Sequence, residues 1–233
     1  MSAHECTRFR TNPLTFARDV CINLQGAGGL VAPGGFNANK SYSPCWFDLE
    51  PWSSSIFSSA TQVILKPTTT MAPGLLQGYY VPYISFGNVA SKDADHIDMV
   101  LLDGVPKTLP AYSVVFTGGQ NGCSLLMLKG GSADTVSFVH YPNSDGKKKG
   151  YPLLSQVGKT GADILLAIDF EMYGEENNPN AASFFFYDGT KWVGVTQPQV
   201  QGAISMSQMR PSMSINRNRP PRFVSATSTG IIA

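Results

Sequence analysis

Charged side chains are scarce in this 233-residue chain, because Lys, Arg, Asp and Glu together make up 14% of it, where about 25% is typical of globular proteins. The 17 basic residues nearly balance the 16 acidic ones, so the formal net charge is only +1. This balance gives no whole-chain electrostatic reason to bind a polyanion. We therefore expect no nucleic acid and no membrane among the partners.

Long apolar runs are also missing, since Gly, Pro, Ser or a charge interrupts every run before it reaches the ~18 residues that a membrane-spanning helix needs. The first ten residues, MSAHECTRFR, carry charges but are not followed by the apolar stretch of about 7–15 residues that a signal peptide contains. We therefore expect neither a membrane span nor a signal peptide.

Cysteine and histidine are few, with four and three copies. Cys6, Cys21, Cys45 and Cys123 are irregularly spaced and no export signal precedes them, which indicates reduced thiols rather than a disulfide framework. His4 lies two residues before Cys6, but a second ligand pair at metal-binding spacing is missing. The sequence therefore predicts no metal and no cofactor.

Apolar and aromatic residues are plentiful, at 42% and 11%, and the 23 glycines and 16 prolines favour turns between short strands. From residue 61 onward, nine segments rich in Val, Ile, Leu, Phe and Tyr are bounded by turn residues, a pattern that predicts strands. They are Gln62–Lys66, Tyr79–Phe86, His96–Leu102, Tyr112–Thr117, Ser124–Lys129, Asp134–Tyr141, Asp163–Glu171, Ser183–Tyr187 and Lys191–Val195.

The expected fold class is strand-rich α/β. Continuous apolar runs such as ILLAIDF and SFFFY predict strands covered on both faces, so we expect either two packed sheets or one sheet with helices over it. Within residues 1–60 only Thr15–Leu24 resembles a helix, and Asp188–Trp192 carries the Asp-Gly signal of a hairpin turn. We expect one domain over residues 1–210, followed by an extended or partly disordered tail over 211–233.

A glycine run, GAGGLVAPGG, covers Gly26–Gly35. A phosphate-binding loop would need the pattern GxxxxGK[ST] between a strand and a helix, and Pro33 breaks any helix at this point. The run therefore predicts a surface loop.

The stretch most informative about chemistry is VVFTGGQNGCSLLMLKGGSADTVSFVHYPN, residues 114–143. It places Cys123 at the start of one strand and His140 at the end of the next, with a tight turn between them. If residues 130–133 form a four-residue hairpin loop, Cys123 lies directly opposite His140 on the neighbouring strand. The two-residue period of a strand then puts both side chains on the same apolar face.

A thiol beside an imidazole is the minimum unit for thiol catalysis. A free thiol has a pKa near 8.5 and is mostly protonated at neutral pH, whereas a neighbouring imidazole can accept its proton and favour the nucleophilic thiolate. His140 would be this base. Just upstream, TGGQNG contains three glycines, whose backbone N–H groups could bind an oxyanion. The hydroxyl or carbonyl of Thr117 could hold the imidazole in its useful tautomer.

Interpretations without catalysis stay open. Cys123 is a buried small hydrophobe and His140 an ordinary strand residue if the chain is a non-catalytic β-sandwich binding module, such as a lectin or adhesin domain. The aromatic-rich segments Ser43–Trp52 and Gln77–Tyr83 could then bind a sugar or a protein, or form a core strand or its rim. A group of carboxylates is interpreted as solvated; its members are Asp163, Asp169, Glu171, Glu175 and Glu176.

The order and spacing of Thr117, Cys123 and His140 resemble the Thr, Cys, His signature of glutamine deamidases. This group comprises the bacterial cytotoxic necrotizing factors, the Burkholderia lethal factor and the chemotaxis receptor deamidase CheD. The resemblance covers residues 117–143. In one respect it departs from the toxins, which have Ser-Gly-Cys where this chain has Asn121-Gly122-Cys123.

The resemblance implies a fold like that of cytotoxic necrotizing factor and CheD: a sandwich of two mixed β-sheets with a few helices and long loops. It implies that Cys123 is the nucleophile, that His140 is the base and acid, and that Thr117 orients the imidazole. Backbone groups of Asn121, Gly122 and Ser124 would bind the oxyanion.

The implied reaction converts a glutamine side chain of a target protein to glutamate through a thiol acyl-enzyme, without a cofactor. A transglutaminase is a variant of the same chemistry in which an amine replaces water. The implied partner is a target protein such as a host GTPase or translation factor, and the enzyme is expected to be a monomer. Its implied location is the bacterial cytoplasm, or the host cytosol after delivery.

Overall fold

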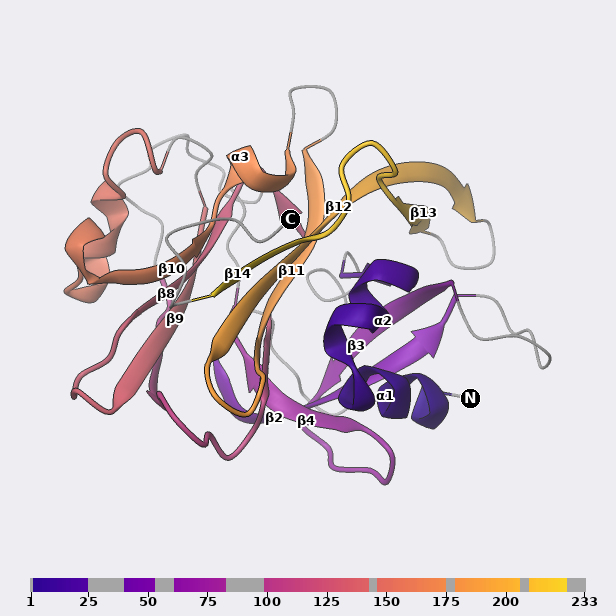
Figure 1. The fold of residues 1–233 in the computed structure, drawn as a ribbon, viewed down its shortest axis with the longest axis horizontal. Helices are drawn as coiled ribbons and strands as arrows, with labels where there is room; N and C mark the ends of the chain where they lie inside the picture. The colour runs from indigo at the N-terminus through magenta and orange to yellow at the C-terminus, as the bar shows by residue number, and fades with distance from the viewer. Residues whose placement is uncertain are drawn as a thin grey trace.

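The computed structural model describes residues 2–24, 40–52, 61–82, 99–142, 146–174, 179–205 and 210–225. The expected strand-rich α/β class is confirmed: a mixed, nearly closed barrel-like sheet of eight strands packs against a four-stranded sheet, with few helices (Figure 1). The small sheet is antiparallel, whereas both sheets were expected to be mixed.

Each sheet brings together segments that are distant in the sequence. The large sheet runs in the order β1 (Cys21–Asn23), β3 (Gln62–Thr68), β2 (Tyr42–Pro51), β4 (Leu76–Tyr80), β6 (Val114–Phe116), β11 (Asn180–Tyr187), β12 (Trp192–Ser205) and β13 (Arg210–Ile215). Two further strands join it: β7 (Gln120–Asn121) beside β11, and β14 (Arg222–Ser225) beside β12. The small sheet runs in the order β10 (Ile164–Ile168), β8 (Ser124–Lys129), β9 (Thr135–Tyr141) and β5 (Leu102–Pro106).

The helices are short, which agrees with the high glycine and proline content. They are α1 (Ser2–Thr11), α2 (Pro13–Asp19) and α3 (Phe170–Tyr173), with 3₁₀ turns η3 (Pro152–Val157) and η4 (Gly161–Asp163). Asn12 separates α1 from α2, and its side chain accepts a hydrogen bond from the Thr15 N–H at 2.9 Å. Because Pro13 follows at the first helical position, the sequence N-P both ends α1 and starts α2.

The first two helices cover the concave side of the large sheet. Phe9 of α1 contacts Phe16 of α2 and also Phe116 and Phe184 from β6 and β11, with ring centroids 5.4–5.5 Å apart. Figure 1 shows these helices on one side of β11 and β12 and the small sheet on the other side. The large sheet is therefore buried on both faces.

The SFFFY run of β11 follows from this two-sided burial. Phe184 and Phe186 face the core that α1 and α2 fill, whereas Phe185 faces the small sheet. Phe138 of β9 meets Phe185 across the two sheets, with ring centroids 5.2 Å apart. The expectation of strands covered on both faces is thus confirmed.

The beginning of the chain differs from expectation. The helix expected over Thr15–Leu24 ends at Asp19, and Cys21–Asn23 forms β1, which pairs in parallel with β3. Long-range contacts decide this outcome, because the backbone N–H of Ile22 donates to the side chain of Gln197 at 2.8 Å. Helix α1 was not expected, since only Cys6 and Phe9 give it a buried apolar face.

The C-terminal segment contributes to the large sheet. Residues from 211 onward were expected to form an extended or partly disordered tail. Instead, β14 pairs with the first part of β12 and β13 pairs with its second part. Phe223 is buried against the helix-filled core, which explains why β14 docks. The described fold therefore continues to Ser225, and residues 226–233 lie outside the described part, as does the glycine run at residues 26–35.

Two buried glutamines connect the ends of the large sheet. The Gln197 amide nitrogen donates to the carbonyls of Ala17 and Val20 at 2.7 and 2.8 Å, and its oxygen accepts from the Ile22 N–H. Gln199 donates to the Ile22 carbonyl and to the Gln197 side-chain oxygen, both at 2.7 Å. These side-chain amides take the place of a strand partner between β12 and β1. We call this set of hydrogen bonds the glutamine seam.

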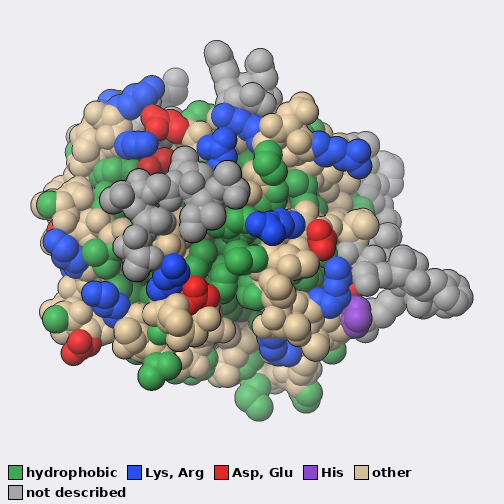
Figure 2. All heavy atoms as spheres, in the orientation of Figure 1, with side chains coloured by type: hydrophobic (Ala, Val, Ile, Leu, Met, Phe, Trp, Pro, Cys, Tyr) green, Lys and Arg blue, Asp and Glu red, His purple; other side chains and the backbone are tan. Residues whose placement is uncertain are grey.

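Basic and acidic side chains are interspersed on the face of the molecule drawn in Figure 2, in agreement with the near-neutral composition. Among the residues that the structure describes, no helix is long and apolar enough to cross a membrane.

The glutamine seam gives a first prediction. Replacing Gln197 by Met keeps the length of the side chain but leaves the Ile22 N–H and two carbonyls without this partner, so the free energy of unfolding should fall by about 3 kcal/mol or more. Urea unfolding measures the change. The matched control is Gln201→Met in the same strand, where the side chain is exposed and the change should stay within about 0.5 kcal/mol. Equal effects of both substitutions would mean that the seam does not hold the sheet together.

Candidate active site

The register of the β8–β9 hairpin differs from the expected one. His140 lies opposite Leu125, and Ser124 lies opposite Tyr141, so the expectation that Cys123 directly faces His140 was wrong. The hairpin loop covers residues 131–134 instead of 130–133, because the Gly130 N–H donates to the Thr135 carbonyl at 3.1 Å. A Cβ atom on residue 130 would lie only 2.6 Å from the Thr135 carbonyl carbon, so glycine permits this additional pair.

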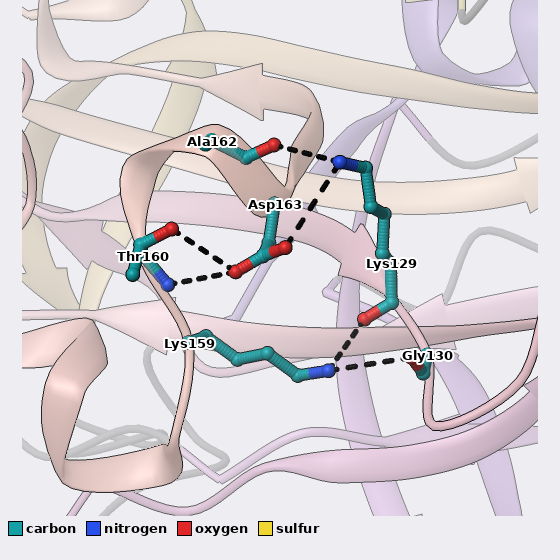
Figure 3. A network of polar contacts seen from close by, with 6 residues as sticks. All are labelled: Lys129, Gly130, Lys159, Thr160, Ala162 and Asp163. Carbon is teal, nitrogen blue, oxygen red and sulfur yellow. Dashed lines mark hydrogen bonds and ion pairs between the residues drawn. The ribbon is translucent and has the colours of Figure 1, made fainter.

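Two lysines anchor the hairpin in this register (Figure 3). The Lys159 ammonium donates to the carbonyls of Lys129 and Gly130 at 2.8 and 3.4 Å. The Lys129 ammonium donates to the Ala162 carbonyl at 3.0 Å and lies 4.0 Å from an Asp163 oxygen. The turn of the hairpin is thereby attached to the segment that leads into β10.

The register shift changes the distance between the two candidate residues but not their face. A shift of two residues preserves the alternation of a strand, and Leu125 and Met127 share one core cluster with Val136 and Phe138. His140 pairs with Leu125 and therefore lies on the face that looks toward the large sheet. Cys123 is one residue before β8, and continued alternation of the strand would place it diagonal to His140. Such neighbours have Cα atoms about 7–8 Å apart, compared with about 5 Å for opposed residues.

The contact expected between Thr117 and His140 is present. The Thr117 hydroxyl oxygen lies 2.8 Å from His140 Nδ1, and the two residues are 0% and 3% exposed. Thr117 directly follows β6 of the large sheet, whereas His140 belongs to β9 of the small sheet. This hydrogen bond therefore spans the two sheets and fixes the orientation of the imidazole.

Cys123 lies where the chain crosses from one sheet to the other. Asn121 is the last residue of β7 in the large sheet, Ser124 is the first residue of β8 in the small sheet, and Gly122 makes the crossing with a φ of 85°. The Tyr173 hydroxyl donates to the Cys123 carbonyl at 2.5 Å. The backbone on both sides of the thiol is thus held in place.

The thiol and the imidazole are both buried. Cys123 is 6% exposed, and burial raises the pKa of its thiol to about 11, partly offset by the backbone N–H of Asn121. Burial lowers the pKa of His140 to about 3. At neutral pH this closed arrangement holds a neutral thiol and a neutral imidazole, so the thiolate expected from the sequence is not formed in it.

A second polar group lies behind Cys123, on the outer face of the small sheet. The hydroxyls of Ser124 and Tyr151 both donate to one oxygen of Asp169, at 2.9 and 2.5 Å. Asp169 is 6% exposed, so its interpretation as a solvated carboxylate was wrong. On the rim, Lys147 pairs with Glu171 at 2.9 Å.

Sequence reasoning missed Tyr151, Tyr173 and the burial of Asp169. The position of Asp169 directly after the buried ILLAI run was the available signal, because a carboxylate at the end of a core strand is easily covered. Nothing in the local sequence indicates the two tyrosines. In the part of the chain that the structure describes, no group of three or more His, Cys, Asp and Glu side chains could hold a metal ion.

Comparison of the chain with protein-family models and with curated proteins gives no match. The resemblance to glutamine deamidases therefore depends on the residue pattern of Thr117, Cys123 and His140.

The Thr117–His140 hydrogen bond gives a second prediction. Thr117→Val keeps the shape of the side chain but removes the hydroxyl from a buried nitrogen, so the free energy of unfolding should fall by about 1–3 kcal/mol. Thr117→Ser retains the hydroxyl and is the matched control. Urea unfolding measures stability, and NMR of the imidazole nitrogens reports the tautomer of His140. An unchanged tautomer in Thr117→Val would contradict the orienting role.

The burial of His140 gives a third prediction, on pH. The pKa of about 3 in the folded state lies below the ordinary value of about 6.5, so the neutral imidazole contributes full stability above about pH 6.5. That contribution is lost as the pH falls toward 3, by about 1.5 kcal/mol between pH 6.5 and pH 5. His140→Asn should lose correspondingly less stability over this interval. His4→Asn, which changes a side chain that is 63% exposed, should behave as the wild type does.

Proposed function

We propose that this protein is a cysteine-dependent protein glutamine deamidase in which Cys123 is the nucleophile, His140 the base and acid, and Thr117 the residue that orients the imidazole. The observation that carries the proposal is the 2.8 Å hydrogen bond between Thr117 and His140, which fixes the imidazole in the orientation that the proposed base needs. The proposal places the thiol of Cys123, which lies one residue before β8, within reach of this imidazole. We infer further that the sandwich is of the type found in the deamidases that this pattern resembles.

The proposed reaction has two steps. His140 accepts the thiol proton, the sulfur attacks the side-chain amide carbon of glutamine, and ammonia leaves with that proton, which leaves a thioester on Cys123. Water then attacks the thioester with His140 as base, which releases glutamate and restores the thiol. If an amine attacks the thioester instead of water, it becomes joined to the glutamine side chain, which is the transglutaminase reaction.

Each neighbour of the thiol has a part in this scheme. For Nε2 of His140 to accept a proton, Nδ1 must carry its hydrogen and donate it to the Thr117 oxygen. The Asn121 N–H lowers the pKa of the thiol and would favour the thiolate. With the backbone groups of Gly122 and Ser124, it supplies donors for the oxyanion.

The scheme requires that the site open. The pKa values of about 11 for Cys123 and about 3 for His140 make proton transfer between them strongly unfavourable while both are buried. Contact with water or with the substrate amide reduces the burial, so the pKa of the thiol falls and the pKa of the imidazole rises. We therefore assign the described arrangement to the resting state.

The target would be a glutamine on another protein, such as a host GTPase or translation factor. The enzyme would act as a monomer in the bacterial cytoplasm or, after delivery, in the host cytosol. These assignments depend on the resemblance alone.

A second candidate is a non-catalytic β-sandwich binding module. The burial of Cys123 and the raised pKa of its thiol favour it, because a structural cysteine has these properties and a reactive one is usually exposed with a lowered pKa.

A fourth prediction separates the two functions. The protein should be incubated with a panel of glutamine-containing peptides and with candidate GTPases and translation factors. A deamidase should release ammonia and convert Gln to Glu in at least one of them, which peptide mass spectrometry detects. Cys123→Ser should abolish the release with the fold retained, and His140→Ala should lower it by about 10²–10⁴-fold. Cys21→Ser is the matched control, since Cys21 is also buried and its thiol pKa is raised to about 12.

Thiol labelling completes this experiment. In the deamidase, Cys123 should be the one cysteine of the four that reacts fast with iodoacetamide. Slow and uniform labelling together with no ammonia from any substrate would instead assign the chain to the binding modules.

A further inference from the structure

A cavity of about 650 Å³ opens at the end of the barrel-like sheet, between the α1–α2 corner and the strands. Its lining includes Tyr112 and Val114 at the start of β6, whereas Thr117 of the candidate active site follows the end of β6. The cavity and the candidate active site therefore lie at opposite ends of this strand. We call the cavity the barrel-end pocket.

Two neighbouring strands of the large sheet, β4 and β6, contribute residues to the pocket. β4 and β6 pair in parallel at Tyr79 with Val115 and at Tyr80 with Phe116. The residues before these pairs include Gln77 in β4 and Ser113 just before β6, and both line the pocket. Its volume falls in the range of about 300–1,000 Å³ common for small-molecule sites, which occur often at the mouths of barrels.

Three aromatic residues belong to its lining. Trp46, Tyr112 and Tyr187 come from three different segments and are each only partly buried. Tyr112 packs edge-on against Tyr79 with centroids 5.1 Å apart, and Tyr187 packs against Trp192 at 5.7 Å. These contacts hold two of the rings in place, so the wall is formed before a ligand arrives.

The two charges in the lining are already hydrogen-bonded within the protein. The Arg10 guanidinium donates to the carbonyls of Gly74 and Leu75. One oxygen of Asp188 accepts from the N–H and hydroxyl of Thr190 at 2.8 and 2.7 Å and from the Lys191 N–H at 2.9 Å. One cation and one anion cancel, so the pocket has no net charge with which to attract an ionic ligand.

Uncharged polar groups complete the lining. The amides of Gln77 and Asn12 and the hydroxyl of Ser113 belong to exposed residues at the pocket, and they offer both donors and acceptors. A purely apolar ligand would bury such groups without partners, which is unfavourable. The lining therefore suits a neutral molecule that combines apolar faces with many hydroxyl groups.

We propose that the barrel-end pocket binds a neutral carbohydrate, with a pyranose ring stacked on its aromatic wall and hydroxyls bonded to Gln77 and its polar neighbours. The C–H faces of a pyranose match the rings of Trp46, Tyr112 and Tyr187. Its hydroxyls both donate and accept, as the amides require. This binding goes beyond the proposed deamidase activity and does not involve Cys123.

The test is a titration of the full chain with glucose, galactose, mannose, N-acetylglucosamine and their disaccharides. Saturation-transfer NMR and tryptophan fluorescence should detect saturable binding of at least one of these sugars. Sorbitol has the hydroxyls but no ring, and should bind at least about tenfold more weakly. Trp46→Ala and Gln77→Ala should each weaken the binding of the sugar by about tenfold or more.

Trp52→Ala is the matched control, because Trp52 is a partly buried tryptophan outside the pocket lining and should leave sugar binding unchanged. If Trp46→Ala does not fold, the exposed Gln77 provides the decisive variant. Absence of binding by every sugar, equal binding of sorbitol, or binding unaffected by Gln77→Ala overturns the proposal. The proposal is also overturned if a peptide from a combinatorial library binds in the pocket and none of the sugars does.

Discussion

The burial of β11 on both faces is the constraint on which the rest of the structure depends. Four consecutive large apolar residues in an extended strand must be covered from two sides, because alternate side chains point in opposite directions. Helices α1 and α2 cover Phe184 and Phe186, and the small sheet covers Phe185. The curved large sheet, the helices inside it and the second sheet behind it all follow from that requirement. Trp192 extends the arrangement by donating its indole N–H to the Pro106 carbonyl of the small sheet at 3.3 Å.

This layering also determines where chemistry can occur. The chain passes between the sheets at Gly122 and Cys123, and the Thr117–His140 hydrogen bond joins the sheets beside that passage. A residue at such a crossing has its backbone held from two directions, here also by the Tyr173 hydroxyl. The same packing excludes water, which keeps the thiol and the imidazole neutral. The proposed deamidase chemistry would therefore require this packing to loosen beside Cys123.

The sequence predicted local features better than long-range ones. The bounds of β8 and the Asp188–Trp192 hairpin were correct, because a run of apolar residues with its turn signal is read within a few positions. The shared face of the Cys123 and His140 strands was also correct, since it needs only alternation. The register was wrong by two residues, because a glycine at position 130 allowed one more pair than the loop pattern indicated. The strand at Cys21–Asn23 could not be predicted locally, since its partners are the distant strand β3 and the side chains of Gln197 and Gln199.

The glutamine seam has a consequence for the order in which the chain folds. Gln197 and Ile22 are 175 positions apart, so during synthesis the N-terminal helices emerge long before the strand that fixes β1 in place. Until then, Phe9 and Phe16 have no closed sheet to cover them, and their apolar faces stay available to other surfaces. Contacts between such distant parts of a chain form slowly, because the loop between them must first be closed. Completion of the barrel is therefore a late event, and the period before it is when a nascent chain of this protein is most exposed to misassociation.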